Sequence, residues 1–169
     1  PILQSDAGKW DGSTVEAAMV IRENETYKMW YSGWSPDSSG IGYATSPDGI
    51  NWTKYSWNPI LEPGTDAWES GLVAYCTVMP DEVGGYKMWY AGTEGHECGE
   101  SKWQLGYATS TDGITWIKAD SLNPMFSPGK VGQWNSYACG PFGPNILIIN
   151  NKYHMFYTGI GDNYIRDRA

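Results

Sequence analysis

The chain has 169 residues, of which 19 are acidic and 11 basic, and its formal charge of −8 disfavours nucleic acids and anionic membrane surfaces as partners. No apolar run approaches the roughly 18 residues of a membrane-spanning helix. No basic segment followed by an apolar stretch opens the sequence, so no secretion signal is visible and localisation stays open. Ten Trp, twelve Tyr, twenty-one Gly and ten Pro favour strands and tight turns over helices, which predicts an all-β protein.

The chain repeats itself, and the repeated segments carry the aromatic residues. Segment 27–33 reads YKMWYSG and returns as YKMWYAG at 86–92 and as YHMFYTG at 153–159. Segment 41–52, IGYATSPDGINW, returns almost unchanged as LGYATSTDGITW at 105–116. Repetition of the same segments at similar intervals along a chain is typical of architectures built from stacked, similar units.

Each unit is predicted to form four short strands. In the first unit these are Ala18–Arg22, Tyr27–Ser32, Ile41–Thr45 and Trp52–Tyr55. An Asp-Gly pair between the last two strands is a strong hairpin signal. One such sheet cannot hide both faces from water, and radial stacking of similar sheets gives a β-propeller of four-stranded antiparallel blades.

We therefore predict about three blades within a single partial propeller domain, 1–169. A third repeated segment, Asn58 to Trp68, returns from Asn123 to Trp134 and has a truncated first copy at 1–10. It delimits the units at roughly 1–57, 58–122 and 123–169.

The ends of the chain leave the predicted ring incomplete. Pro1–Leu3 is expected to be the outermost strand of a preceding blade, and 146–158 the two inner strands of a third blade. Tyr164–Arg168 is a candidate for one more strand. Unpaired strand edges invite pairing with other chains. We therefore expect either a fragment of a longer protein or a homo-oligomer whose copies close each other's edges.

The repeated motifs resemble those of the propeller glycosidase superfamily, the five-bladed families that include arabinanases, β-xylosidases, levansucrases, invertases and mannosyl-glycoside phosphorylases. The resemblance covers essentially the whole chain and marks the fold more specifically than an activity. The turn from Ser46 to Trp52 is also similar to a shortened Asp-box turn of sialidase propellers, where the motif is structural. The resemblance implies an oligosaccharide or polysaccharide as partner, no cofactor and a secreted or periplasmic location.

The superfamily cleaves glycosidic bonds with three carboxylates from different blades: a general base, a general acid and an Asp that orients the acid. The stretch from Val15 to Val20 resembles the Glu-Gly-Pro stretch that carries the acid, so the resemblance implies Glu16 as the candidate general acid. Hydrolysis needs one carboxyl group to protonate the leaving oxygen and an ionised one to act from the opposite face.

The positions equivalent to Glu16 in the other units are Ala74 and Phe142, and neither titrates. The position of the superfamily's base falls on Ala17, Tyr75 and Gly143. Two hypotheses therefore stay open: a glycoside hydrolase whose other carboxylates lie elsewhere, or a non-catalytic propeller that binds glycans or mediates assembly. A phosphorylase would need a cationic pocket for phosphate, which eleven basic residues make less attractive.

Each unit opens with a tryptophan followed by a polar residue. As candidate substrate-binding residues, these pairs are Trp10 and Asp11, Trp68 and Glu69, and Trp134 and Asn135. One hypothesis places them on a polar rim around a sugar pocket; the alternative is local turn hydrogen bonding, and Asp66 has the same ambiguity.

The remaining aromatic residues divide by whether they repeat. Trp30 and Trp89, and likewise Trp52 and Trp116, are repeat-equivalent, which indicates packing. The tryptophans without counterparts are freer to contact a ligand, although packing remains an alternative for each; they are Trp34, Trp57 and Trp103.

We predict no metal site. Segment 94–100 concentrates acidic, His and Cys side chains, but its spacing matches no zinc or calcium pattern, so we interpret it as a solvated acidic loop. His154 takes the place of Lys28 and Lys87, at a sheet surface. The three cysteines are odd in number and too few for a disulfide scaffold. We interpret them as small buried apolar residues: Cys76, Cys98 and Cys139.

Overall fold

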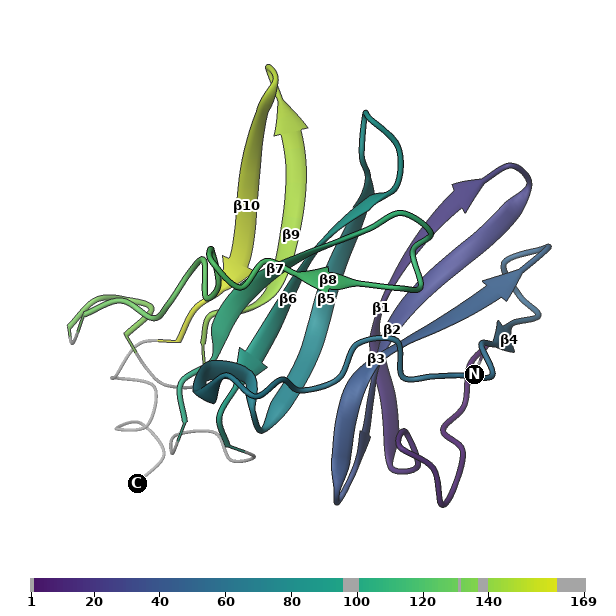
Figure 1. The fold of residues 1–169 in the computed structure, drawn as a ribbon, viewed down its shortest axis with the longest axis horizontal. Helices are drawn as coiled ribbons and strands as arrows, with labels where there is room; N and C mark the ends of the chain where they lie inside the picture. The colour runs from purple at the N-terminus through teal and green to yellow at the C-terminus, as the bar shows by residue number, and fades with distance from the viewer. Residues whose placement is uncertain (1, 96–100, 131, 137–139, 161–169) are drawn as a thin grey trace.

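The computed structural model describes residues 2–95, 101–130, 132–136 and 140–160, which form three antiparallel sheets (Figure 1). The first sheet contains β1 (Thr14–Glu23), β2 (Thr26–Ser35), β3 (Ser38–Ser46) and β4 (Thr53–Lys54). The second contains β5 (Leu72–Pro80), β6 (Tyr86–Thr93), β7 (Gln104–Ser110) and β8 (Ile117–Lys118). The third is the hairpin of β9 (Phe142–Ile149) and β10 (Lys152–Thr158).

In both four-stranded sheets the strands lie in chain order, and every pairing is antiparallel. The prediction of all-β, four-stranded antiparallel units is therefore confirmed. The described residues contain one helical element, the 3-10 turn η1 (Ala67–Glu69), and no helix in them is long and apolar enough to cross a membrane. The outermost strand expected at the start of the chain is absent from its described part, since residues 2 and 3 belong to no strand. Tyr164–Arg168 lies outside the described residues.

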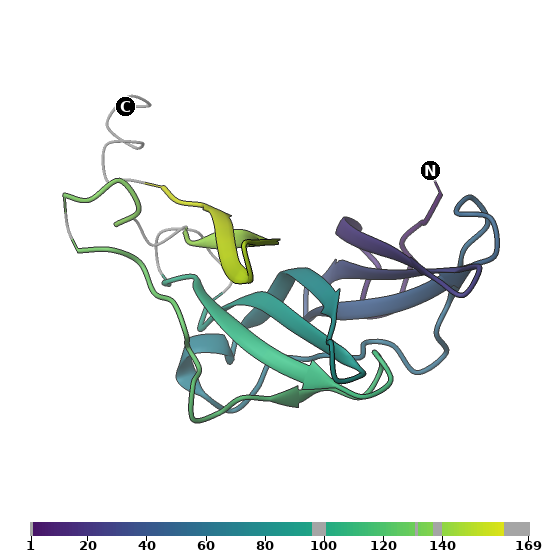
Figure 2. The same ribbon diagram turned by 90° about the horizontal axis from the view of Figure 1, so that it is seen from above.

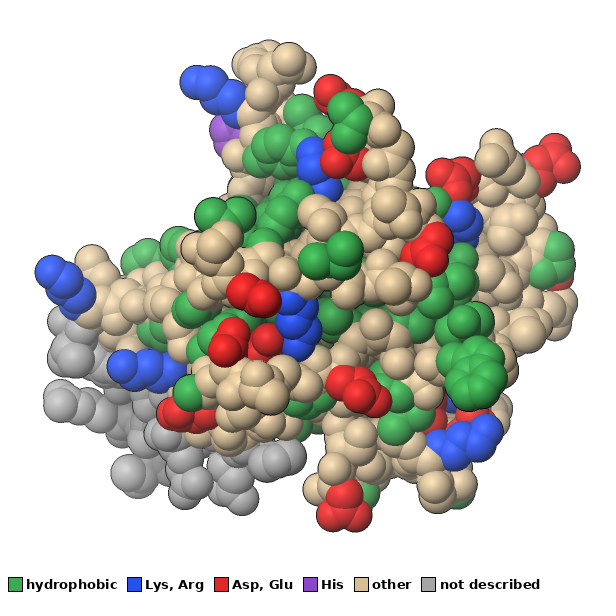
Figure 3. Space-filling view, viewed as in Figure 1, with side chains coloured by type: hydrophobic (Ala, Val, Ile, Leu, Met, Phe, Trp, Pro, Cys, Tyr) green, Lys and Arg blue, Asp and Glu red, His purple; other side chains and the backbone are tan. Residues whose placement is uncertain are grey.

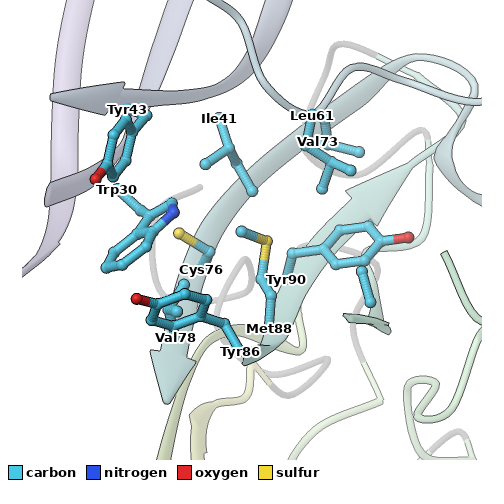
Figure 4. Packing of buried hydrophobic residues seen from close by; sticks show 11 residues of the cluster. Trp30, Ile41, Tyr43, Leu61, Val73, Cys76, Val78, Tyr86, Met88 and Tyr90 are labelled. Atoms are coloured by element: carbon cyan, nitrogen blue, oxygen red, sulfur yellow. The ribbon is translucent and has the colours of Figure 1, made fainter. Parts of the chain in front are cut away.

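The sheets follow one another along an arc (Figure 2). Strand β5 contacts the face of the first sheet, and β9 contacts β5 and β6 of the second. Apolar side chains of the first and second sheets therefore form one shared core between them (Figure 4). Its buried members are Trp30, Ile41, Tyr43, Leu61, Val73, Cys76, Val78, Tyr86, Met88, Tyr90 and Ala108.

The glycine that ends the YKMWYSG segment makes room for the tryptophan that opens the unit. A Cβ on Gly33 would lie 2.4 Å from the Trp10 ring, and one on Gly92 would lie 2.8 Å from Trp68. Real Cβ atoms do not approach other heavy atoms so closely, so only glycine fits there. Each tryptophan can then pack on a tyrosine of its own unit, with 5.8 Å between the ring centroids of Trp10 and Tyr31.

The Asp-Gly turns are closed by hydrogen bonds within the turn. The Asp112 carboxylate accepts the amides of Ile114 and Thr115 at 2.8 and 2.7 Å. The indole of Trp116 donates to the Gly113 carbonyl at 3.2 Å. The first copy, around Asp48, repeats these contacts. The predicted structural role of this motif is confirmed.

The third sheet exposes apolar side chains at the surface (Figure 3). Five large apolar residues of the hairpin are at least 44% exposed: Leu147, Ile148, Ile149, Tyr153 and Phe156. Closure of this edge by a second copy stays a prediction.

Candidate functional site

The three sheets share an irregularity at the beginning of their first strands. Pairing between β1 and β2 shifts between Glu16 and Met19, and pairing between β5 and β6 shifts between Ala74 and Thr77. At each shift one residue has a positive φ: 49° at Ala17 and 53° at Tyr75. β9 has the same feature at Gly143, with a φ of 61°. Such bulges re-aim side chains and occur next to active sites more often than elsewhere in sheets.

The bulge of β1 presents the candidate acid. Glu16 is exposed, and its Oε1 accepts a hydrogen bond from the Tyr75 hydroxyl of the second sheet at 3.2 Å. Burial, together with the charge and hydrogen bond of Glu16, raises the pKa of Tyr75 to about 12. Tyr75 is therefore a hydrogen-bond donor at neutral pH. The carboxyl group and the hydroxyl form a polar pair at the junction of the two sheets.

The backbone of Tyr75 is tied to the same place. Its N–H donates to the Ser32 Oγ at 2.8 Å, and Ser32 lies opposite Glu16 in the register of β1 and β2. Ser32 is fully buried, so its hydroxyl has a fixed environment. Tyr75 thus holds its place beside Glu16 through two hydrogen bonds, one from its backbone N–H and one from its side-chain hydroxyl.

Aromatic rings from all three sheets surround Tyr75. Its ring centroid lies 6.2 Å from that of Trp34, 5.6 Å from that of Trp103 and 5.4 Å from that of Phe142. The Trp34 indole N–H is buried without a hydrogen-bond partner in the described part of the chain. Two of the tryptophans without repeat counterparts therefore lie here, whereas Trp57 is 79% exposed elsewhere. Aromatic faces can stack on the apolar faces of sugar rings, so a carboxyl group beside them suits a carbohydrate site.

The polar residues that follow the opening tryptophans make a different set of contacts. Asp11 is 1% exposed, and its carboxylate bonds Lys54 at 2.6 Å and the Tyr31 hydroxyl at 3.4 Å. Glu69 is 2% exposed and repeats the arrangement, with Lys118 and the Tyr90 hydroxyl each at 2.9 Å. These are clamps that hold the segment before each sheet against that sheet. The contacts reach across each unit and so go beyond the local turn hydrogen bonding that was one of the two alternatives.

The third unit keeps part of the clamp. Asn135 donates to the Tyr157 hydroxyl at 3.0 Å, while Trp134 is 63% exposed. Trp10 lines a pocket beside Asp6 and Lys54. In the described part of the chain, no hydrogen bond or ion pair joins the residues of the clamps to Glu16. A role for the six candidate substrate-binding residues at a sugar pocket stays a prediction.

Burial raises the pKa of the buried Cys76 thiol to about 12, which fits the predicted small apolar role. Cys98, Cys139 and most of segment 94–100 lie outside the described residues. Within the described ranges, no three His, Cys, Asp or Glu side chains gather as a metal site would require.

The repeat-equivalent tryptophans are structural as predicted, with Trp30 fully buried and donating to the Gly113 carbonyl of the second sheet at 2.8 Å.

Sequence reasoning missed Tyr75 and Ser32 as partners of Glu16. Tyr75 stands where the superfamily has its base, and a search for a titrating carboxylate passes over it. The signal available was a bulky, polar-tipped side chain at a position that holds alanine and glycine in the other units.

Comparisons with known proteins identify the architecture. No protein-family model matches the chain. The chain is 30% identical, over 97% of its length, to the uncharacterized protein Rv1502 of Mycobacterium tuberculosis, and it covers 54% of that protein. It is 33% identical, over 64% of its length, to a beta-1,2-mannobiose phosphorylase of Thermoanaerobacter sp., of which it covers 37%. The chain thus spans about half the length, or less, of these curated relatives.

Solved structures decide the fold. Zg3597, a family 117 glycoside hydrolase from the marine bacterium Zobellia galactanivorans, matches 90% of this chain and 50% of its own, with a TM-score of 0.66 and 20% identity. A glycosyl hydrolase from Bacteroides ovatus matches 88% of this chain and 44% of its own, with a TM-score of 0.61 and 20% identity. The fold is that of the propeller glycosidases. The sheets are blades of a propeller, and the resemblance of the repeat motifs to this superfamily is confirmed.

In the propeller glycosidase fold, β1, β5 and β9 are the first strands of successive blades. The three bulges are therefore equivalent positions in consecutive blades. Among the residues that begin them, Glu16 alone carries a titratable carboxyl group, since the other two are Ala74 and Phe142.

Proposed function

We propose that the protein is carbohydrate-active and cleaves a glycosidic bond of an oligosaccharide or polysaccharide, with Glu16 as the general acid. The observation that supports this most directly is the position of Glu16, exposed on the bulge of a first strand and hydrogen-bonded by Tyr75. In its protonated form the carboxyl group can donate to the leaving oxygen while the nearby aromatic rings contact the sugar. A second carboxylate, required for the opposite face, would come from outside the bulges described above.

The attacking group in this proposal is water. Hydrolysis adds water across the glycosidic bond, whereas phosphorolysis transfers the glycosyl group to phosphate and gives a sugar 1-phosphate. One relative is a beta-1,2-mannobiose phosphorylase, which makes β-1,2-mannobiose a sensible first substrate. Five lysines are already paired with carboxylates and so are poor candidates for phosphate binding: Lys9, Lys28, Lys54, Lys87 and Lys118.

The test is sugar release from a panel of β-linked manno-oligosaccharides and arabino- and xylo-oligosaccharides by the full-length protein, with and without inorganic phosphate. Glu16→Gln should lower turnover at least about 100-fold, the usual contribution of a general acid. Glu82→Gln makes the same chemical change at an exposed residue of the β5–β6 turn and should leave turnover unchanged. Undiminished turnover in Glu16→Gln would remove Glu16 from the mechanism, and product formed only with phosphate would replace hydrolysis by phosphorolysis.

A non-catalytic, glycan-binding propeller is the second candidate. It is favoured by the residues equivalent to Glu16, Ala74 and Phe142, because neither can replace a second carboxylate. Binding to a glycan array by a protein that releases no product from any bound glycan would support this candidate. Detectable bond cleavage would count against it.

A further inference from the structure

Tyr75 occupies a backbone conformation that a tyrosine rarely adopts. Its φ is 53°, in the left-handed region, where a bulky side chain is a genuine outlier. The equivalent bulge residues are Ala17 and Gly143, so the bulge itself forms with little or no side chain. Strained residues of this kind persist where the surroundings hold them, and they concentrate at functional sites. The side chain at position 75 therefore calls for an explanation beyond the bulge.

Both polar groups of Tyr75 are directed to one spot on the first blade. The N–H bonds Ser32 and the hydroxyl bonds Glu16, and these two residues face each other across β1 and β2. The ring lies among Trp34, Trp103 and Phe142, one from each of the three blades. The hydroxyl consequently has little freedom to leave the carboxyl group.

We propose that Tyr75 is a positioning residue for Glu16, whose hydroxyl fixes the orientation of the carboxyl group across the junction of the first two blades. Because Tyr75 donates to Oε1, Oε2 is the oxygen that carries the proton to be donated. β2 places Ser32 opposite Glu16, and β5 places Tyr75 beside it. Among the described residues, Tyr75 is the one titratable group that forms a hydrogen bond with Glu16. The proposal rests on the proposed function of Glu16.

The test replaces Tyr75 by phenylalanine in the full-length protein, which keeps the ring and removes only the hydroxyl. The NMR chemical shift of the labelled Glu16 side-chain carboxyl carbon should change, because the hydrogen bond to its Oε1 is lost. With the β-linked oligosaccharide that is cleaved, kcat should fall about tenfold while KM should change less than about twofold.

Tyr86→Phe is the matched control, because it removes the hydroxyl from another hydrogen bond between a tyrosine and a glutamate of neighbouring blades. It should leave the carboxyl carbon chemical shift of Glu16 and kcat unchanged. A reciprocal measurement guards against misfolding of the Tyr75 variant: in Glu16→Gln, the pKa of Tyr75 should fall, as seen in the difference absorbance of tyrosinate.

Identical Glu16 carboxyl carbon shifts and identical kcat in Tyr75→Phe and the wild-type protein would overturn the positioning role. Full activity of Glu16→Gln would instead overturn the proposed function, while the carboxyl carbon shift of Glu16 in Tyr75→Phe would still report whether Tyr75 holds the carboxyl group.

Discussion

The hydroxyl of Tyr86 in the second blade donates a 2.6 Å hydrogen bond to the carboxylate of Glu23 in the first. Lys28 completes the group by bonding both Glu23 and Tyr86. A related contact follows one blade later, where Lys87 bonds the Tyr153 hydroxyl of the third blade at 3.0 Å. Polar links of this kind tie neighbouring blades together in addition to the apolar core.

Tyr86→Phe should lower the free energy of unfolding by about 1 kcal/mol, since a partly exposed hydrogen bond to a charged group is lost. Hydrogen bonds from Lys28 and Tyr86 lower the pKa of Glu23. This stabilisation is present above the ordinary pKa of a glutamate and is lost as the pH falls through the lowered one. Urea unfolding between pH 7 and pH 3 should therefore show wild type and variant converging in acid, and a constant difference would contradict this link.

Glu69→Ala should destabilise the second blade by about 3 kcal/mol, because a buried carboxylate that bonds Lys118 and Tyr90 is removed. Glu69→Gln keeps an acceptor for the tyrosine hydroxyl and should lose about half as much. Denaturant midpoints of the two variants provide the comparison. Equal losses would mean that the negative charge paired with Lys118, and not the acceptor for the Tyr90 hydroxyl that glutamine keeps, stabilises the segment.

Asp112→Ala should lower the free energy of unfolding by about 1 kcal/mol by leaving turn amides without their acceptor. Desolvation would raise the pKa of Asp112, but hydrogen bonds from the amides of Thr115 and Ile114 prevail and lower it to about 2. Its contribution is therefore present above an ordinary aspartate pKa and is lost as the pH falls from about 4 toward 2. Thermal unfolding at pH 7 and pH 2.5 measures this: a deficit as large at pH 2.5 as at pH 7 would argue against the carboxylate.

Gly33→Ala should cost about 1–3 kcal/mol, because its Cβ would meet the Trp10 ring at 2.4 Å and force the ring to move. Trp10→Phe replaces the indole by a smaller ring. The double variant should therefore lose less free energy of unfolding than the sum of the losses in the two single variants. Strict additivity in a double-mutant cycle would show that the glycine serves another purpose.

Local patterns were sufficient to predict much of the fold. The YKMWYSG segment and the Asp-Gly hairpin specify strands and turns through contacts between residues close in the chain, such as those around Asp112. The repeats then indicated stacked sheets, because a single sheet of this kind has two faces to cover. The predicted strand at the start of the chain was wrong, since three residues carry too little information to show whether they have a pairing partner.

The candidate site was predictable only in part. Glu16 was found because its neighbours match a motif, but Asp11 and Glu69 gave no sign in the sequence of the lysines that neutralise them. Each lysine follows its carboxylate partner by about fifty residues or fewer in the sequence. Each lies on an outer strand, and the register of that strand depends on the whole sheet.

The amino-acid sequence by itself determined the blades, since strand alternation, turn chemistry and the glycines that admit tryptophan all act within one unit. Only the tertiary structure decided that Tyr75 meets Glu16, which precedes it by 59 residues. That contact arises from the packing of one bulged strand on the next blade, and its geometry depends on backbone angles and blade stacking that no local pattern encodes.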